Sequence, residues 1–296
     1  MIMHEVAPRI RIYRDLMPTV SNLYNYISNG DENTETKYLL FPWKKWKANW
    51  HGHMMQIPYW RTRDLNVIHE DSEFQNKIFE ELENAFVYAL EDYLKDFSDF
   101  GYLPYELKNI KLDKDIMSVS NTCTALRYSA PEKNKSNKID ENPMFFHSDT
   151  DPFDPGYPGE KLIITLTMYL NDDYEGGEIA FYDPQTSKVF KYKPKAGDIT
   201  IFPSFPPFYH GVLPFDKGDR FLIRTFLSYD YKGDDFWNEF KSKFDEELLK
   251  EVEHERKRRS YILGLNNRSV VLSKDVDKKT QFQPLFIKND PIEIIF

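Results

Sequence analysis

The sequence predicts a mainly β fold with flanking helices, in which short strands form a double-sheet barrel of the jelly-roll type. From about residue 116 the spacing of apolar residues changes from the helical period of about 3.6 to the strand period of about 2. Turn-forming stretches such as DDYEGG, DPQTS, PKAG and FDKG separate the apolar runs. About eight short strands joined by such turns are typical of a jelly roll.

Composition and charge exclude several classes of function. The chain has 296 residues, of which 41% are hydrophobic, so it is long enough to bury a sizeable core. Its formal net charge of −9 argues against general nucleic-acid binding, which needs clustered Lys and Arg. The single cysteine, Cys123, excludes a disulfide framework and a thiolate zinc cluster. With no signal-like N-terminus and no long apolar run, we expect a cytoplasmic protein without a membrane partner.

The first 115 residues are expected to form a helical support region of the same domain. Residues 9–30 predict a short strand followed by an amphipathic helix ending at Gly30. Residues 41–60 are rich in Trp and Lys but have no period, so no element is predicted there. Residues 70–97 predict a longer helix. Its apolar residues recur at three- and four-residue steps: Phe74, Ile78, Phe79, Leu82, Phe86, Ala89, Leu90 and Tyr93.

The predicted β core spans residues 116–230. Its strands are expected near residues 116–128, 143–147, 161–170, 178–182, 188–193, 198–202, 207–213 and 220–229. The polar stretch 131–142 is expected to be an insertion within the first pair. Residues 231–296 are expected to hold a charged C-terminal helix and, from 263, a tail without a predicted element.

A metal site is suggested by the stretch FFHSDTDPFDPGYPGE, residues 145–160. Side chains alternate faces along a strand, so His147 and Asp149 share one face and can bind one ion. A third ligand must come from another strand, and His210 is the later histidine that falls on one, whereas His254 lies in a polar helix. Two histidines and a carboxylate that leave other positions open suit non-heme Fe(II). By itself, a His–Asp pair is more often a surface hydrogen bond than a metal site.

Ten residues after His210, Arg220 follows a predicted tight turn, FDKG. A guanidinium there could form two parallel hydrogen bonds with a carboxylate of a molecule bound at the metal.

The order His-x-Asp, about sixty residues, His, then ten residues to an Arg resembles the Fe(II)/2-oxoglutarate-dependent dioxygenases, and most closely their prolyl 4-hydroxylase-like subgroup. Two further stretches, MYLNDDYEGGEIAFYDP and YKPKAGDITIFPS, are similar to motifs of that subgroup, and RIRIYRDLMP looks like its usual opening. The resemblance covers residues 116–230 well and the first hundred residues loosely. It implies a double-stranded β-helix core, jelly-roll or cupin-like, with N-terminal helices packed on one sheet.

The resemblance also implies the cofactors and the site. Fe(2+) would be held by His147, Asp149 and His210, which are therefore the catalytic residues. The co-substrate would be 2-oxoglutarate, and ascorbate is a candidate reductant.

Three residues would bind 2-oxoglutarate. Arg220 and Tyr169 would bind its far carboxylate, and Tyr128 resembles the tyrosine at the end of the strand that enters the site. Tyr169 could instead be an ordinary core tyrosine. Alternation places it on a polar face with Thr165 and Thr167, which would line the pocket.

Arg224 and Phe226 share a face with Arg220 and are candidate substrate contacts. Relatives usually have a small or neutral residue at the position of Arg224. An inward arginine needs an anionic partner. That partner could be an acidic substrate group or a protein carboxylate, or the side chain could turn outward.

The implied activity is hydroxylation of a C–H bond with release of succinate and CO2. The substrate implied by the resemblance is a prolyl residue in a peptide or protein. A free amino acid or another small acidic metabolite is an alternative, and a jelly-roll binding module without catalysis is another. The sequence does not define an oligomeric state.

Two other segments have alternative readings. His51 and His53 could bind metal, but no third ligand is evident, so a structural or lid segment is favoured. The tryptophans of residues 41–60 could stack bases or pack against the barrel, and the sequence favours packing. The basic cluster at 255–259 ends a predicted helix, where cations complement the helix dipole.

Overall fold

Two antiparallel sheets form the centre of the molecule. The computed structural model describes residues 1–29, 43–50, 53–64, 73–97, 117–119, 124–130, 144–149, 162–183, 188–204, 208–213, 215–229 and 292–293.

The larger sheet has nine strands, and its centre is formed by β12, β8, β15 and β6. In sheet order its strands are β1 (Ile2–Ala7), β2 (Ile10–Arg14), β12 (Ile199–Pro203), β8 (Leu162–Tyr169), β15 (Asp219–Tyr229), β6 (Thr124–Ser129), β4 (His53–Asp64) and β3 (Lys44–Trp50), with β5 (Met117–Val119) paired to β15. Every pairing within this sheet is antiparallel.

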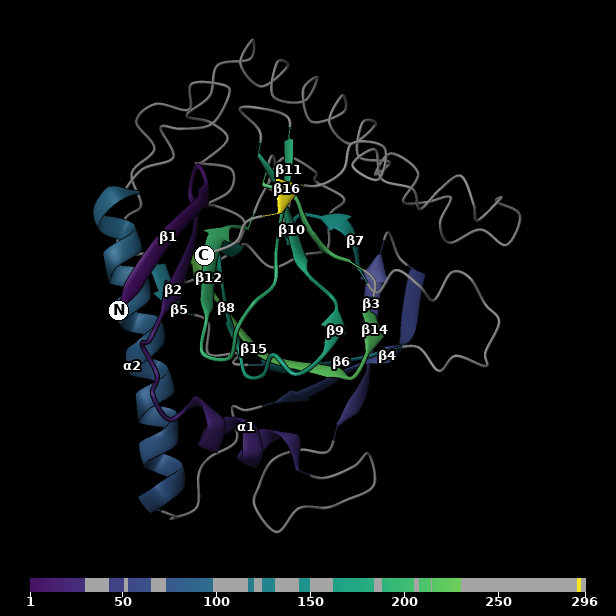
Figure 1. The fold of residues 1–296 in the computed structure, drawn as a ribbon, viewed down its shortest axis with the longest axis horizontal. Coiled ribbons are helices and arrows are strands. Elements are labelled where there is room, and N and C mark those ends of the chain that lie inside the picture. The colour runs from purple at the N-terminus through teal and green to yellow at the C-terminus, as the bar shows by residue number, and fades with distance from the viewer. Residues whose placement is uncertain are drawn as a thin grey trace.

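The smaller sheet faces it across the barrel (Figure 1). Its order is β16 (Ile292–Glu293), β11 (Lys188–Tyr192), β10 (Ile179–Asp183), β13 (His210–Val212) and β7 (Met144–His147). A short ribbon of β9 (Glu175–Gly176) and β14 (Phe215–Lys217) lies outside both sheets.

The strand pairing is that of a jelly roll. Eight strands in chain order, β6, β7, β8, β10, β11, β12, β13 and β15, divide between the sheets. The first pairs with the eighth, the eighth with the third and the third with the sixth. In the other sheet the second pairs with the seventh, the seventh with the fourth and the fourth with the fifth. The predicted fold class is therefore confirmed.

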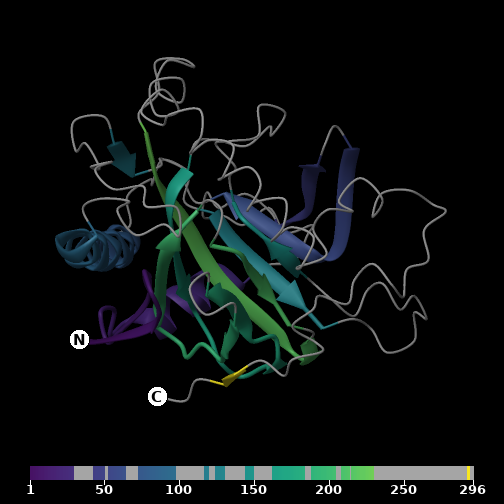
Figure 2. The ribbon, with the colours of Figure 1, turned by 90° about the horizontal axis from the view of Figure 1, so that it is seen from above.

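Two helices cover one side of the larger sheet. The helices are α1 (Val20–Ser28) and α2 (Glu73–Asp96), and both views show α2 beside β1 and β2 (Figures 1 and 2). The predicted apolar stripe of α2 is buried at Ile78, Leu82, Phe86, Ala89, Leu90 and Tyr93. These residues join the side chains of β2, β8, β12 and β15 in one core cluster. None of the described helices is long and apolar enough to cross a bilayer.

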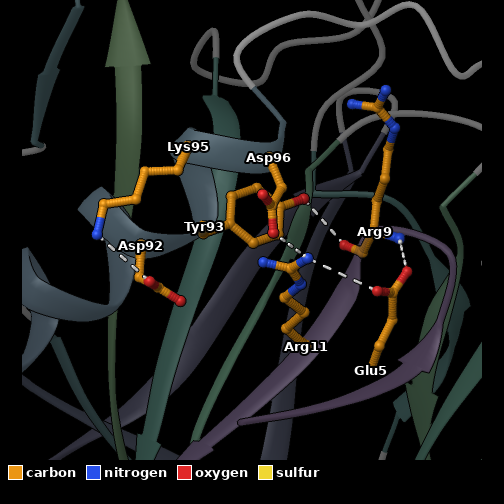
Figure 3. A network of polar contacts seen from close by, with 7 residues as sticks. All are labelled: Glu5, Arg9, Arg11, Asp92, Tyr93, Lys95 and Asp96. Carbon is orange, nitrogen blue, oxygen red and sulfur yellow. Dashed lines mark hydrogen bonds and ion pairs between the residues drawn. The ribbon is translucent and has the colours of Figure 1, made fainter.

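A polar network ties the N-terminal hairpin to the end of α2 (Figure 3). The Arg11 guanidinium donates to Asp96 at 2.7 Å and lies 3.7 Å from Glu5. The Tyr93 hydroxyl donates to the carbonyl oxygen of Arg9 at 2.9 Å, at the tight turn between β1 and β2. The hairpin that extends the larger sheet is thus held against the helix by side chains from both.

The N-terminal region contributes more strands to the larger sheet than the one short strand expected near its start. Residues 41–60, for which no element was predicted, include most of a β-hairpin, β3–β4, and β4 pairs with β6. The hairpin register shifts between Lys45 and Trp46, and such an irregularity interrupts the two-residue period that identifies a strand. The single strand expected at 116–128 is two strands, β5 and β6.

Several predicted features lie outside the described residues. They are the 131–142 insertion, the C-terminal helix, the basic cluster at 255–259 and most of the tail.

Candidate metal and co-substrate site

The two predicted histidine ligands stand opposite each other on neighbouring strands. His147 ends β7, His210 begins β13, and the two are register partners in the antiparallel pair. Opposite residues of such a pair project from the same face of the sheet. Asp149 follows two residues after His147. The backbone therefore brings together the three predicted ligands, although the side chain of His147 is not among those described.

The carboxylate of Asp149 points toward the imidazole of His210. Asp149 Oδ2 lies 3.7 Å from His210 Nε2, and both side chains are buried. On the same oxygen, the Thr165 hydroxyl donates a hydrogen bond of 2.6 Å. The other oxygen, Oδ1, lies 3.6 Å from Nη1 of Arg224.

This geometry fits a metal ion. Two ligand atoms that each lie about 2.1 Å from one ion are at most about 4.2 Å apart, and the Asp149–His210 separation falls within that limit. The ring of Phe202, 4.5 Å from that of His210 between centroids, limits access of water to the imidazole. Among the described side chains no group of three metal-ligating residues is complete. The assignment of the triad to iron therefore stays a prediction.

Arg220 lies further along the interior face of β15 in an aromatic enclosure. Its side chain is only 1% exposed, and it donates to the carbonyl oxygen of Gly177 at 2.6 Å. The guanidinium carbon lies 4.7 Å from the ring centroid of Tyr128, 5.1 Å from that of Phe215 and 5.5 Å from that of Tyr169. The structure thus brings together the three residues predicted to bind the co-substrate.

The enclosure has the character of a carboxylate site. Nε of Arg220 and the hydroxyl of Tyr174 are buried without a hydrogen-bond partner in the described part of the chain. No ion pair of Arg220 occurs there either, and a buried cation is costly without an anion. A carboxylate bound here would accept a hydrogen bond from the guanidinium and would neutralise its charge. The residues present fit 2-oxoglutarate, and this role also stays a prediction.

The tyrosines around Arg220 are neutral hydrogen-bond donors. Burial raises the pKa of Tyr174 to about 12, although the nearby Arg220 opposes the shift. Burial likewise raises the pKa values of Tyr169 and Tyr128 above the ordinary range of tyrosine, again against the effect of Arg220. Tyr169 belongs to the core cluster, as the alternative reading held, and it also faces the guanidinium.

Arg224 turns inward and pairs with the predicted metal ligand rather than pointing to solvent. Its side chain is 22% exposed, and its guanidinium carbon lies 4.9 Å from the ring centroid of the buried Phe226. A protein carboxylate is therefore the partner observed, in line with one of the alternatives above.

Several residues of the site were not anticipated. Tyr174 lies in DDYEGG and was read only as part of a turn. Gly177 has a φ of +67°, and a Cβ added there would meet the Phe215 ring at 2.2 Å. The repeated glycine was a visible signal for a special backbone position. Ser204, which contacts Thr165 at 2.8 Å, gave no signal because its role depends on strand pairing.

The comparison with protein families agrees with the sequence resemblance. Residues 137–228 match the family model described as the 2OG-Fe(II) oxygenase superfamily. No curated protein matches the chain.

Structures similar to this chain include several prolyl hydroxylases. The viral collagen prolyl hydroxylase of Paramecium Bursaria Chlorella virus-1, in its 2OG complex, is 14% identical with a TM-score of 0.42, covering 75% of this chain and 96% of that one. A Pseudomonas putida prolyl-4-hydroxylase is 12% identical with a TM-score of 0.42, covering 75% and 92%. A prolyl hydroxylase from Trichoplax adhaerens, in complex with a hypoxia inducible factor peptide fragment, is 16% identical with a TM-score of 0.44, covering 75% and 84%.

The matched segment contains Asp149, both opposed histidines and Arg220. That superfamily is named for its two requirements, Fe(II) and 2-oxoglutarate. The resemblance inferred from the sequence is thus supported at the level of the superfamily: residues 137–228 are similar to the 2OG-Fe(II) oxygenase superfamily, and the fold is a jelly roll.

Proposed function

We propose that this protein hydroxylates a C–H bond, with Fe(II) held by His147, Asp149 and His210 and with 2-oxoglutarate held by Arg220. The observation that supports this proposal most is the buried Arg220, which has an aromatic enclosure but no carboxylate partner in the described part of the chain. In our proposal, residues 116–230 form the catalytic core and residues 1–115 support it.

When bound, the iron centre with 2-oxoglutarate and O2 supplies the oxidising power: one oxygen atom enters the substrate C–H bond, and the co-substrate leaves as succinate and CO2. The chain itself supplies binding, orientation and exclusion of water. Arg220 neutralises a carboxylate, and the tyrosine hydroxyls around it donate to the same group. The aromatic rings of Tyr128, Tyr169 and Phe215 keep water from this contact, which strengthens it.

The substrate we propose is a prolyl residue in a peptide or protein. The support for it is the sequence likeness to the prolyl 4-hydroxylase-like subgroup, in particular the stretches 168–184 and 192–204. A free amino acid or other small acidic metabolite is the second candidate. It is favoured by Arg224, a second guanidinium on the interior face of β15 that keeps some exposure.

An anaerobic titration with Fe(II) and 2-oxoglutarate tests the proposal. The unchanged protein should develop a weak visible charge-transfer band, His147→Ala should abolish it, and Arg220→Ala should weaken it while metal binding persists. Arg127→Ala is the matched control, because Arg127 pairs with Asp219 on the other face of the sheet. A protein that binds neither iron nor 2-oxoglutarate would instead be a jelly-roll binding module. If the protein does bind both, succinate release with peptides and with amino acids would distinguish the two substrate candidates.

A further inference from the structure

The carboxylate of Asp149 is held by side chains that come from the opposite sheet. Asp149 follows β7 in the smaller sheet, whereas Thr165 is on β8, Ser204 directly follows β12 and Arg224 is on β15, all in the larger sheet. The contacts are 2.6 Å from Thr165 Oγ1 to Oδ2, 2.8 Å from Ser204 Oγ to Thr165 Oγ1, and 3.6 Å from Arg224 Nη1 to Oδ1.

The direction of these hydrogen bonds follows from the charge of the carboxylate. An ionised carboxylate can only accept, so Thr165 must give its single hydroxyl proton to Asp149. The Thr165 oxygen is then left as an acceptor, and Ser204 must donate to it. Both hydroxyl residues are buried, at 1% and 0% exposure, so water does not compete for these bonds.

Each oxygen of Asp149 therefore has a different neighbour. Oδ2 faces His210 and accepts from Thr165, while Oδ1 faces Arg224. Rotation of the carboxylate about its terminal bond would break both contacts at once. A ligand oriented in this way loses less conformational freedom when an ion binds.

We propose that Thr165, supported by Ser204, is a positioning residue that orients the Asp149 carboxylate as a metal ligand, with Arg224 securing its second oxygen. This inference rests on the proposed function, since it assumes that Asp149 binds the ion. The hydroxyl residues give the cleaner test. Removing Arg224 would also remove a positive charge that repels a divalent cation, so its two effects on affinity oppose each other.

The experiment measures affinity for Mn(II), a stand-in for Fe(II), from the paramagnetic resonance signal of the free ion, without O2 or 2-oxoglutarate. Thr165→Val keeps the shape of the side chain but removes its hydroxyl, and should weaken Mn(II) binding about 10- to 100-fold. Thr165→Ser keeps the donor and should stay within about threefold of the unchanged protein. Ser204→Ala, which acts only through Thr165, should weaken binding by a smaller factor.

Thr225→Val is the matched control. Thr225 is equally buried on β15, but alternation places it on the opposite face of the sheet from Arg224 and Phe226. It should bind Mn(II) like the unchanged protein. Circular dichroism before each titration checks that the variants are folded, and Ser204→Ala carries the test if Thr165→Val does not fold.

The outcomes separate the inference from the proposed function. If the folded Thr165→Val and Ser204→Ala proteins bind Mn(II) as tightly as the unchanged protein, the positioning role is wrong and the metal site stands. If the unchanged protein binds no Mn(II), the proposed function is wrong and the inference with it. An equal loss in Thr225→Val would show a general loss of packing and would also overturn the positioning role.

Discussion

Arg220 and Arg224 lie on the same face of the same strand, four residues apart, yet their surroundings differ in kind. Arg220 is almost fully buried among aromatic rings, and within the described residues its hydrogen bond goes to the neutral carbonyl oxygen of Gly177. Arg224 is partly exposed and already has a carboxylate partner in Asp149. The side chains that face each arginine, rather than its position on β15, therefore decide what it can bind. The positive charge of Arg220 can pair with the carboxylate of a ligand, whereas that of Arg224 is already paired with Asp149.

Replacing each arginine in turn tests whether Arg220 and Arg224 have different roles, and it has the largest expected effect. We expect Arg220→Met to weaken 2-oxoglutarate binding by about 30-fold or more, because loss of a buried charged contact costs about 2–5 kcal/mol. Arg224→Met should change it by less than about fivefold, because this arginine contacts Asp149 and not the enclosure. Calorimetric titration with 2-oxoglutarate in the presence of Mn(II) measures both. Equal losses in the two variants would contradict the division of roles.

Gly177 offers a second test, directed at the enclosure around Arg220. An alanine Cβ there would lie 2.2 Å from the Phe215 ring, so the ring must shift from its place beside Arg220. We expect Gly177→Ala to lower the free energy of unfolding by about 1–3 kcal/mol and to weaken 2-oxoglutarate binding. Denaturant unfolding and the same calorimetric titration measure the two effects.

Gly197→Ala is the control for the backbone contribution. Gly197 also has a positive φ, of +88°, but the nearest atom to an added Cβ is a Val20 side-chain carbon at 3.6 Å. It should show the strain of the backbone without the displacement of a ring. If it weakened 2-oxoglutarate binding as much as Gly177→Ala, the enclosure would not be the cause.

Arg14 and Asp198 form another largely buried arginine–carboxylate pair, which does not include a predicted metal ligand. It can therefore be compared with the Arg224–Asp149 pair. Asp198 accepts from Arg14 Nε at 3.0 Å and from the Tyr192 hydroxyl. Burial raises the pKa of Asp198 from 3.8 to about 6, although the backbone N–H of Lys195 and Arg14 oppose the shift.

A carboxyl group whose folded pKa is raised binds its proton more tightly in the folded state. Its contribution to stability is therefore present below about pH 4 and is lost as the pH rises toward about 6. We expect the stability difference between the unchanged protein and Asp198→Asn to change by at most about 3 kcal/mol between pH 4 and 7. Urea unfolding at several pH values measures it. A difference independent of pH would contradict the raised pKa, and Mn(II) affinity at a fixed pH should be the same in both proteins.

Much of the fold and the outline of the site could be predicted from the sequence. The two-residue period located the strands of the jelly roll, and the stripe of α2 located its buried face. The stretch around Tyr169 indicated a polar interior face. These inferences hold because periodicity is a local property: it depends only on residues within a few positions of each other. The shared face of His147 and Asp149 stays a prediction, because Asp149 lies beyond the end of β7.

Which side chains meet could not be predicted from the sequence. The folded chain pairs Arg224 with Asp149, places Tyr174 and Phe215 around Arg220, and joins Ser204 to Thr165. It also adds the β3–β4 hairpin to the larger sheet, where an irregular register hides the strand period. Each of these contacts joins segments distant in the chain, and its geometry follows from strand order and register. Those are set by the packing of the whole barrel, because a shift of one residue in any pairing turns every side chain of that strand to the other face.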